Sequence, residues 1–242
     1  MKPILEIIAT NLEHVKSALS SGAHRLELCA ALGADGLTPS AGFIQSAIAI
    51  SSLPIMVMIR PREGDFRYSD QEIAAMNQDI LWAKQCGAMG IVIGILDEHQ
   101  KIRTDVLQNW VRLAYPMEVT FHRAFDVTEN PFEALEDIIS CGCTRILTAG
   151  KQSSCIDGKQ LIYELQAKAG DRIIIMAGAG INGTTIGNIA HRDIREYHMS
   201  GHQKRNAQNP QEEMFGAAPQ LNLIDIGHVA SVLSEMEVTE IG

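Results

Sequence analysis

The chain has few of the features that mark membrane, secreted or nucleic-acid-binding proteins. No apolar run approaches the roughly 18 residues of a transmembrane helix, and Glu6 interrupts the apolar run that a secretory signal needs. Positive charge is also scarce, because 20 Lys and Arg stand against 29 Asp and Glu, for a net charge of −9. This balance disfavours duplex nucleic acid and anionic membrane surfaces as partners. We therefore expect a cytoplasmic protein with no nucleic-acid or membrane partner.

Several chemical signatures are missing as well. The five cysteines lack the paired spacing of a structural zinc site, and neither HExxH nor GxSxG occurs. An odd number of cysteines without a secretory signal favours reduced thiols over a disulfide framework. The first apolar segment is followed by Thr10-Asn11 rather than by glycines, which argues against a dinucleotide-binding fingerprint.

What the chain does contain is a regular alternation of apolar segments and helical patterns. We predict eight strands, at 4–8, 25–28, 55–59, 90–93, 118–121, 144–147, 172–176 and 194–198. Between them, apolar residues recur at helical spacing, as in 12–20, 70–85, 131–140 and 158–168. Strands that alternate with helices imply a parallel sheet with right-handed crossovers.

Eight strand–helix units in 242 residues predict an α/β fold, a single (β/α)8 TIM-type barrel that spans residues 1–242. An open doubly wound sheet is the alternative, but it usually has fewer strands. The polar segment 199–220 is long for a connection, and we expect it to be a mobile loop. A last helix is expected at about 223–235.

Charged residues within the predicted strands fall on one face. Side chains along a barrel strand point alternately to the interior and to the surrounding helices. Arg25, Glu27 and Cys29 share the face opposite Leu26 and Leu28. Because helices need an apolar surface to pack on, we expect the polar face inside, near the carboxyl-terminal mouth where such barrels have their active sites. A satisfied ionic core is the alternative interpretation.

The same reasoning brings further polar residues to the mouth. Arg60 and Arg62 follow the third strand, and His122 and Asp126 follow the fifth. Guanidinium groups bind carboxylate or phosphate in a bidentate manner, so we expect the two arginines to hold an anion. Glu27, His122 and Asp126 are the candidates for general acid–base catalysis.

The glycine-rich turn 177–181 after the seventh strand is a second candidate anion site. Gly178 and Gly180 allow backbone N–H groups to approach an anion, and TIM-type barrels often bind phosphate after strands seven and eight. A plain tight turn is the alternative interpretation.

A set of ordered motifs resembles one known family. These motifs are RLELCA at 25–30, GLTPSAG at 36–42, MIRPREGDF at 58–66, FHRAFD at 121–126, LTAG at 147–150 and AGAGI at 177–181. With them, the chain from residue 5 to about 198 resembles the CutC family of copper homeostasis proteins. The resemblance implies a cytoplasmic TIM-type barrel, commonly a homodimer, with Cu(I) binding. Cys29 is then the candidate metal ligand.

The first strand departs from the family pattern. Many members look like Glu-x-Cys there, whereas this chain has Ile8 in place of the cysteine. Cu(I) prefers thiolate or thioether donors, usually more than one. Cys29 is therefore the one thiol expected at the mouth, with His122 and His198 as borderline donors and Met58 deeper.

Three functions stay open on the sequence. The resemblance puts a copper homeostasis protein first. The chemistry of the residues by itself favours a TIM-barrel enzyme of unassigned reaction acting on a small anionic metabolite, a phosphate or a carboxylate. The third is a barrel scaffold for partner binding, and the segment 199–220 is the only sequence feature that supports it.

Overall fold

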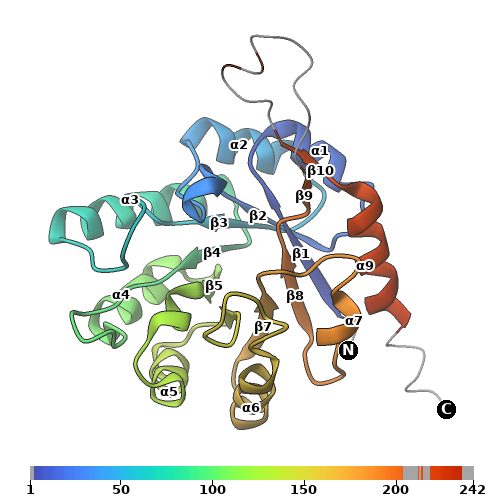
Figure 1. Ribbon diagram of the computed structural model, residues 1–242. Helices are drawn as coiled ribbons and strands as arrows, with labels where there is room; N and C mark the ends of the chain where they lie inside the picture. The colour runs from blue at the N-terminus through green and yellow to red at the C-terminus, as the bar shows by residue number, and fades with distance from the viewer. Residues whose placement is uncertain (1–2, 204–211, 213, 215–218, 236–242) are drawn as a thin grey trace.

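The computed structural model describes residues 3–203, 212, 214 and 219–235. In it, eight parallel strands close into a barrel in their sequence order (Figure 1). The strands are β1 (Ile4–Ala9), β2 (Arg25–Leu28), β3 (Ile55–Met58), β4 (Gly90–Ile93), β5 (Glu118–Phe121), β6 (Arg145–Thr148), β7 (Ile174–Gly178) and β8 (Glu196–Met199). The predicted (β/α)8 barrel is confirmed, and each predicted strand is present.

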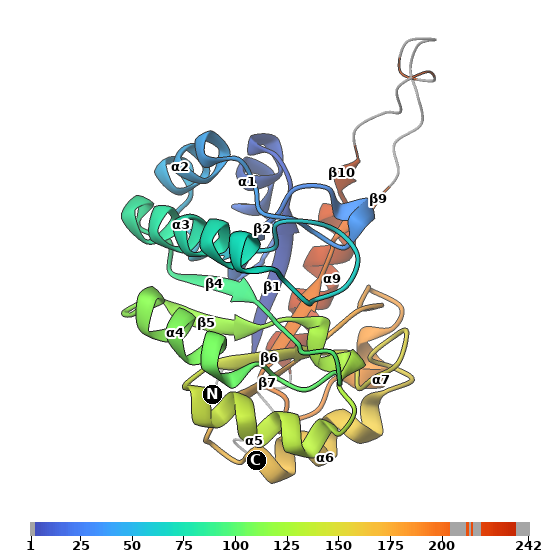
Figure 2. The ribbon, with the colours of Figure 1, turned by 90° about the vertical axis from the view of Figure 1, so that its left-hand side faces the viewer.

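Helices surround the barrel on the outside in both views (Figures 1 and 2). They are α1 (Leu12–Ala18), α2 (Ala41–Ile50), α3 (Asp70–Cys86), α4 (Thr104–Ala114), α5 (Pro131–Cys141), α6 (Lys159–Ala169), α7 (Ile186–Ile189) and α9 (Leu223–Glu235), with 3-10 turns η1 (Leu32–Ala34) and η2 (Arg123–Val127). Local signals set their starts. Ser69 and Glu72 form a capping box at α3, and Asn130 caps α5 ahead of Pro131.

The main apolar core lies between the strands and the helices. Leu26, Leu28 and Val57 point outward from β2 and β3 and are fully buried in it. The alternate residues of the same strands, Arg25 and Glu27 among them, point to the barrel interior. The expected division into an apolar outer face and a polar inner face therefore holds.

The ends of the predicted loop 199–220 are more regular than expected. β9 (His202–Gln203) pairs in antiparallel fashion with β10 (Gln220–Leu221), so the two ends form a short ribbon. Residues 204–211, 213 and 215–218, on which the prediction of mobility chiefly rests, lie outside the described residues. Among the residues that the structure describes, no helix has the length and apolar character to cross a membrane.

Candidate functional site

An ion-paired layer crosses the barrel interior below the mouth. Arg25 Nε donates to Glu6 Oε2 at 2.5 Å, and the same guanidinium also binds Glu196. Arg145 donates to Glu196 Oε2 at 3.0 Å and to Glu118 Oε2 at 2.7 Å. Removing one partner of such a pair leaves an uncompensated buried charge. For Arg25 and Glu196, the satisfied ionic core is therefore the correct interpretation.

Glu27 lies beside this layer without belonging to it. The residue is 2% exposed, and its Oε2 has no hydrogen-bond partner among the residues that the structure describes. Burial raises the pKa of Glu27 to about 7, despite the opposing effect of His198. Glu27 is thus a buried carboxyl group with one oxygen available to a ligand.

His198 and Glu6 complete the floor of the site. Barrel closure sets Glu6 of β1 level with Arg25 of β2 and with His198 of β8. Nδ1 of His198 lies 2.8 Å from Oε1 of Glu6. Burial opposes the imidazolium, but Glu27 and Glu6 outweigh it and raise the pKa of His198. The sequence analysis gave Glu6 and His198 no acid–base role. A closed barrel puts β8 beside β1, and that closure could have predicted that the two residues are neighbours.

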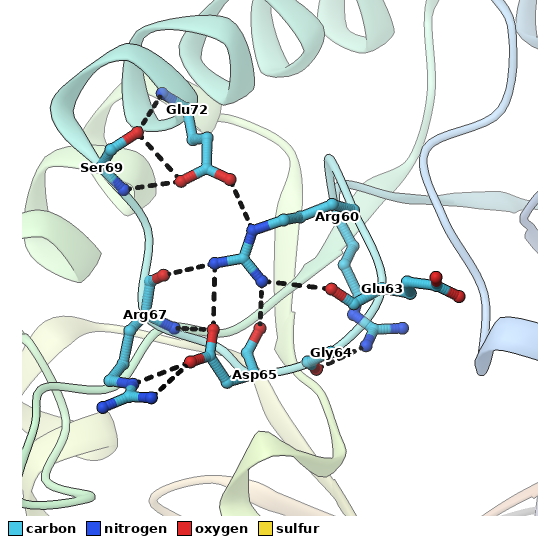
Figure 3. Close-up of polar contacts among 8 residues, drawn as sticks. Arg60, Glu63, Gly64, Asp65, Arg67, Ser69 and Glu72 are labelled. Carbon is cyan, nitrogen blue, oxygen red and sulfur yellow. Dashed lines mark hydrogen bonds and ion pairs between the residues drawn. The ribbon is translucent and has the colours of Figure 1, made fainter.

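Arg60 is buried at the mouth and holds two loops together. Its guanidinium donates to the carbonyl oxygens of Ala34 (2.6 Å), Gly36 (3.1 Å) and Gly64 (3.0 Å), the last of which is drawn in Figure 3. It also lies 5.2 Å from the centroid of the Phe66 ring. Within the described part of the chain, no carboxylate pairs with it. Its positive charge is therefore uncompensated by any neighbouring anion there.

His122 offers a single hydrogen-bond donor. Its Nδ1 accepts the backbone N–H of Ala124 at 3.1 Å, so the neutral ring carries its proton on Nε2. Nε2 is buried and has no hydrogen-bond partner within the described part of the chain. Burial, and then the charge of Arg60, lower the pKa of His122 to about 3. The ring therefore stays neutral in the physiological range.

These groups surround one cavity of about 640 Å³ at the carboxyl ends of the strands. Its lining includes Glu27, Met58, Arg60, Phe66, His122, Arg123, Asp126, Gly180, His198 and His202. Of the residues predicted for the site, the structure brings Glu27, Arg60, His122, Asp126 and Gly180 to this cavity. Phe66, His198 and His202 join them without having been predicted for acid–base or anion-binding roles.

Two predicted anion-binding residues lie elsewhere. Arg62 is held by Glu72 Oε1 at 2.6 Å and by Asp65 Oδ1 at 2.9 Å, next to the start of α3. Figure 3 shows Ser69, Glu72 and Asp65 in this network, and none of these three residues, nor Arg62, lines the cavity. Gly178 packs inside β7, where a Cβ atom would come within 2.4 Å of Leu147.

Asp126 lines the cavity but has its oxygens engaged. They accept the backbone N–H groups of Ala149 and Lys151 at 3.0–3.2 Å, together with the hydroxyl of Thr148. Arg123 pairs with the same carboxylate at 2.8 Å. The carboxylate thus ties η2 to the segment after β6.

Cys29, the candidate copper ligand, is fully buried and does not line the cavity. Burial and the neighbouring Glu27 raise the pKa of its thiol well above its usual range. It belongs to a small apolar cluster inside the barrel with Ile8, Met56, Met58 and Val92. All five cysteines are free thiols, as the sequence predicted.

A closed (β/α)8 barrel with a cavity at the carboxyl ends of its strands is the architecture of TIM-type barrels. The sequence matches the model of the CutC family over residues 3–203. A CutC family protein of Pasteurella multocida is 45% identical over 207 residues, which is 85% of each chain. One from Vibrio vulnificus is 43% identical over 235 residues, 94% of each chain. The chain therefore belongs to the CutC family.

Solved structures agree with this assignment. CutC from Streptococcus agalactiae is 30% identical, with a TM-score of 0.76 over 82% of this chain and 98% of that chain. An aldolase, QR15, has a TM-score of 0.61 at 13% identity over 98% of this chain and 95% of its own. KGPDC from Streptococcus mutans has a TM-score of 0.63 at 8% identity, over 97% of this chain and 99% of that chain. The last two share the fold alone.

Proposed function

We propose that the cavity at the barrel mouth binds a small anionic metabolite, a carboxylate or a phosphate, and that the protein is an enzyme acting on it. One observation carries the proposal. Glu27 Oε2 and His122 Nε2 are both buried without a partner, and both residues line one cavity. An unsatisfied buried polar atom costs about 1–3 kcal/mol. A ligand that bonds to both atoms removes this cost.

Arg60 and His122 supply the recognition of the anion. The hydrogen bonds from Arg60 to three carbonyl oxygens fix its position, so it acts on the ligand mainly through its charge. His122 adds an N–H donor on a neutral ring, so it can donate a hydrogen bond to the anion without first taking up a proton. Gly180 extends the same wall, at a φ of +85°. A fixed charge and a fixed donor in a partly dry cavity stabilise an anion without reorganisation.

Glu27 is the group that we assign to proton exchange with the bound metabolite. Glu27 lines the cavity and one of its oxygens has no partner among the described residues, whereas the ring of His122 is held neutral and acts as a donor. Asp126 acts by holding η2 against the segment after β6, because its oxygens are engaged by main-chain donors. Arg62 contributes from outside the cavity, by fixing the loop that follows Arg60.

Thermal-shift screening against phosphorylated and carboxylated metabolites tests this function. A ligand present at a hundred times its Kd stabilises the folded protein by about 2.7 kcal/mol, a shift of several degrees. We expect such a ligand for the wild type, and a much smaller shift for Glu27→Gln and His122→Phe, each checked for folding by circular dichroism. Arg172→Lys, at an exposed ion pair with Glu136 outside the cavity lining, should keep the shift. No stabilisation across the panel, or equal shifts in all variants, would contradict the proposal.

Copper binding is a second candidate, favoured by one observation. The Streptococcus agalactiae relative is described, provisionally, as a copper homeostasis protein. In this chain, Cys29 is clustered with Met56 and Met58, so three sulfur side chains lie together. Soft donors of this kind suit Cu(I). The cluster supplies a single thiol because Ile8 occupies the place of a second. Ile8 and Met58 of the cluster line the cavity, whereas Cys29 does not.

An anaerobic titration against a Cu(I) chelator separates this candidate from the first. Cu(I) binding through Cys29 predicts competition at micromolar protein that is lost in Cys29→Ser and kept in Cys86→Ser. Absence of competition, or equal competition in both variants, excludes it. The family resemblance also supports a cytoplasmic homodimer, which sedimentation velocity and cell fractionation test.

A further inference from the structure

We infer that Glu27 and His198, with Glu6 behind them, form a binding site for one divalent transition-metal cation on the floor of the cavity. The three residues come from β2, β8 and β1, and all three are buried. One ligand atom from each lies within 4.8 Å of those of the other two. Glu27 and His198 line the cavity, so an ion has a route to them.

The free oxygen of Glu27 is the observation that points to a ligand. The residue is 2% exposed, and Oε2 lacks any hydrogen-bond partner in the structure. Its neighbours Glu6 and Glu196 are satisfied by Arg25. A buried carboxylate without a partner is rare in folded proteins because it is costly. A cation at this position supplies the missing partner.

The arrangement of His198 is that of a metal-binding imidazole. Such a ring donates its second N–H to a carboxylate, which fixes the orientation of the nitrogen that binds the ion. Nδ1 of His198 lies 2.8 Å from Oε1 of Glu6, and Arg25 holds the other oxygen of Glu6 at 2.5 Å. Nε2 is then the nitrogen left for an ion. Glu6 orients the ring, and Glu27 is the second direct ligand.

The charge of the interior also favours a cation. Three buried carboxylates, those of Glu6, Glu27 and Glu196, face two buried guanidinium groups, those of Arg25 and Arg145. With all three carboxylates ionised, the excess charge of this buried set is negative. Among the described residues Glu27 has no ion pair, and a cation beside it offsets the excess without any proton on Glu27 or His198.

The donor atoms select the class of ion. Imidazole nitrogen and carboxylate oxygen suit Zn²⁺, Mn²⁺ or Fe²⁺, whereas Cu(I) prefers the sulfur cluster around Cys29. The remaining coordination positions open to the cavity, where water or a ligand oxygen completes the shell. This inference shares the free oxygen of Glu27 with the anion proposal, but it needs neither Arg60 nor His122. In the cation-loaded protein, Glu27 is a ligand and does not exchange a proton.

The test uses the full chain, freed of metal by chelation and dialysis. Zn²⁺ is titrated in competition with a chromophoric chelator, and Mn²⁺ is followed by loss of the free-ion electron paramagnetic resonance signal. We expect one equivalent to bind. Glu27→Gln and His198→Asn should each weaken binding at least tenfold, while Cys29→Ser and the exposed control His99→Asn should leave it unchanged.

Where a variant folds poorly, anomalous scattering at the zinc edge still tests the site, because it uses crystals of the wild-type protein. A peak within bonding distance of Glu27 and His198 in wild-type crystals supports the site. An absence of binding by the wild type at 100-fold excess Zn²⁺, binding that is equal in Glu27→Gln, or a peak only at surface histidines would overturn it. An anion screen without hits leaves this outcome unaffected, so the two proposals fail separately.

Discussion

Nδ1 of His14 lies 3.1 Å from Nε2 of His202, and the two rings meet edge to face with centroids 4.6 Å apart. Nε2 of His14 lies 2.9 Å from the carbonyl oxygen of Pro219. Helix α1 is therefore fastened to both ends of the segment that carries β9 and β10. Only one proton fits between the facing nitrogens, and Nδ1 of His14 also accepts the backbone N–H of Thr10, so His14 is the neutral acceptor and Nε2 of His202 is the donor.

This contact predicts a loss of stability in acid. Burial, and then His14, lower the pKa of His202 to about 4, from 6.5 in the unfolded chain. As the pH falls from 6.5 towards 4, the unfolded chain takes up a proton that the folded protein does not, so unfolding becomes more favourable. We expect a loss of about 1–2 kcal/mol over this range, because partial exposure weakens the effect.

Urea unfolding from pH 7 to pH 4 measures this loss. His202→Asn should be less stable at pH 7 and should show a flatter dependence on pH than the wild type. The exposed His99 is the matched control, and His99→Asn should follow the wild-type curve. Parallel curves for wild type and His202→Asn would show that the contact does not titrate.

The ion-paired layer predicts a large difference between two arginines. Arg145 is 2% exposed and pairs with Glu196 and Glu118, so Arg145→Met should cost about 3–5 kcal/mol of unfolding free energy. Arg172 pairs with Glu136 where both side chains are nearly half exposed, and Arg172→Met should cost less than about 1 kcal/mol. Chemical denaturation gives both values. Similar losses for the two variants would contradict the assignment of a buried ionic layer.

Two glycines make a second matched pair. A Cβ atom at Gly158 would lie 1.9 Å from the carbonyl oxygen of Ala149, so Gly158→Ala should force the start of α6 away from the end of β6. We expect a loss of more than about 2 kcal/mol. At Gly42, in the first turn of α2, no described atom outside the adjoining residues and the backbone of the same helix lies within 4 Å of that position. Gly42→Ala should be neutral or stabilise by up to about 1 kcal/mol in the same unfolding assay.

The hydrogen bonds of Asp126 predict that its replacement lowers the unfolding free energy whether or not a ligand is bound. Replacing it with asparagine turns an acceptor oxygen into a donor that faces main-chain N–H groups. Asp126→Asn should lower the unfolding free energy by about 1–3 kcal/mol. Asp65→Asn, at an exposed ion pair with Arg67, should change it by less than about 1 kcal/mol. An Asp126→Asn protein as stable as the wild type would mean that the carboxylate does not hold the two loops.

Alternation along the strands was enough to predict much of the site. Glu27 sits within β2, His122 directly follows β5, and Arg60 lies two residues after the end of β3, so the two-residue period places them at the interior or the mouth. The alternation of side chains between the interior and the exterior no longer holds once a strand ends. The strand β3 ends at Met58, and Pro61 then redirects the chain, so Arg62 reaches the start of α3 instead.

The relation between Glu6 and His198 needed the tertiary structure. The two residues are 192 positions apart, and only barrel closure puts β8 beside β1. Likewise, the separation of Cys29 from the cavity depends on how Met58 and Leu32 pack around it, and no local sequence pattern specifies that packing. The fold thus follows from the repeated strand–helix units, whereas the partners of each polar atom follow from packing.

The most direct test of a ligand at the barrel mouth is a crystal structure at a resolution that distinguishes water from an organic anion. The crystals would contain the protein as purified, and then the protein soaked with carboxylates and phosphates. We expect an anion whose oxygen lies about 3 Å from Nε2 of His122, with a second polar atom at Oε2 of Glu27. Water alone at both atoms, before and after soaking, would contradict the proposed function.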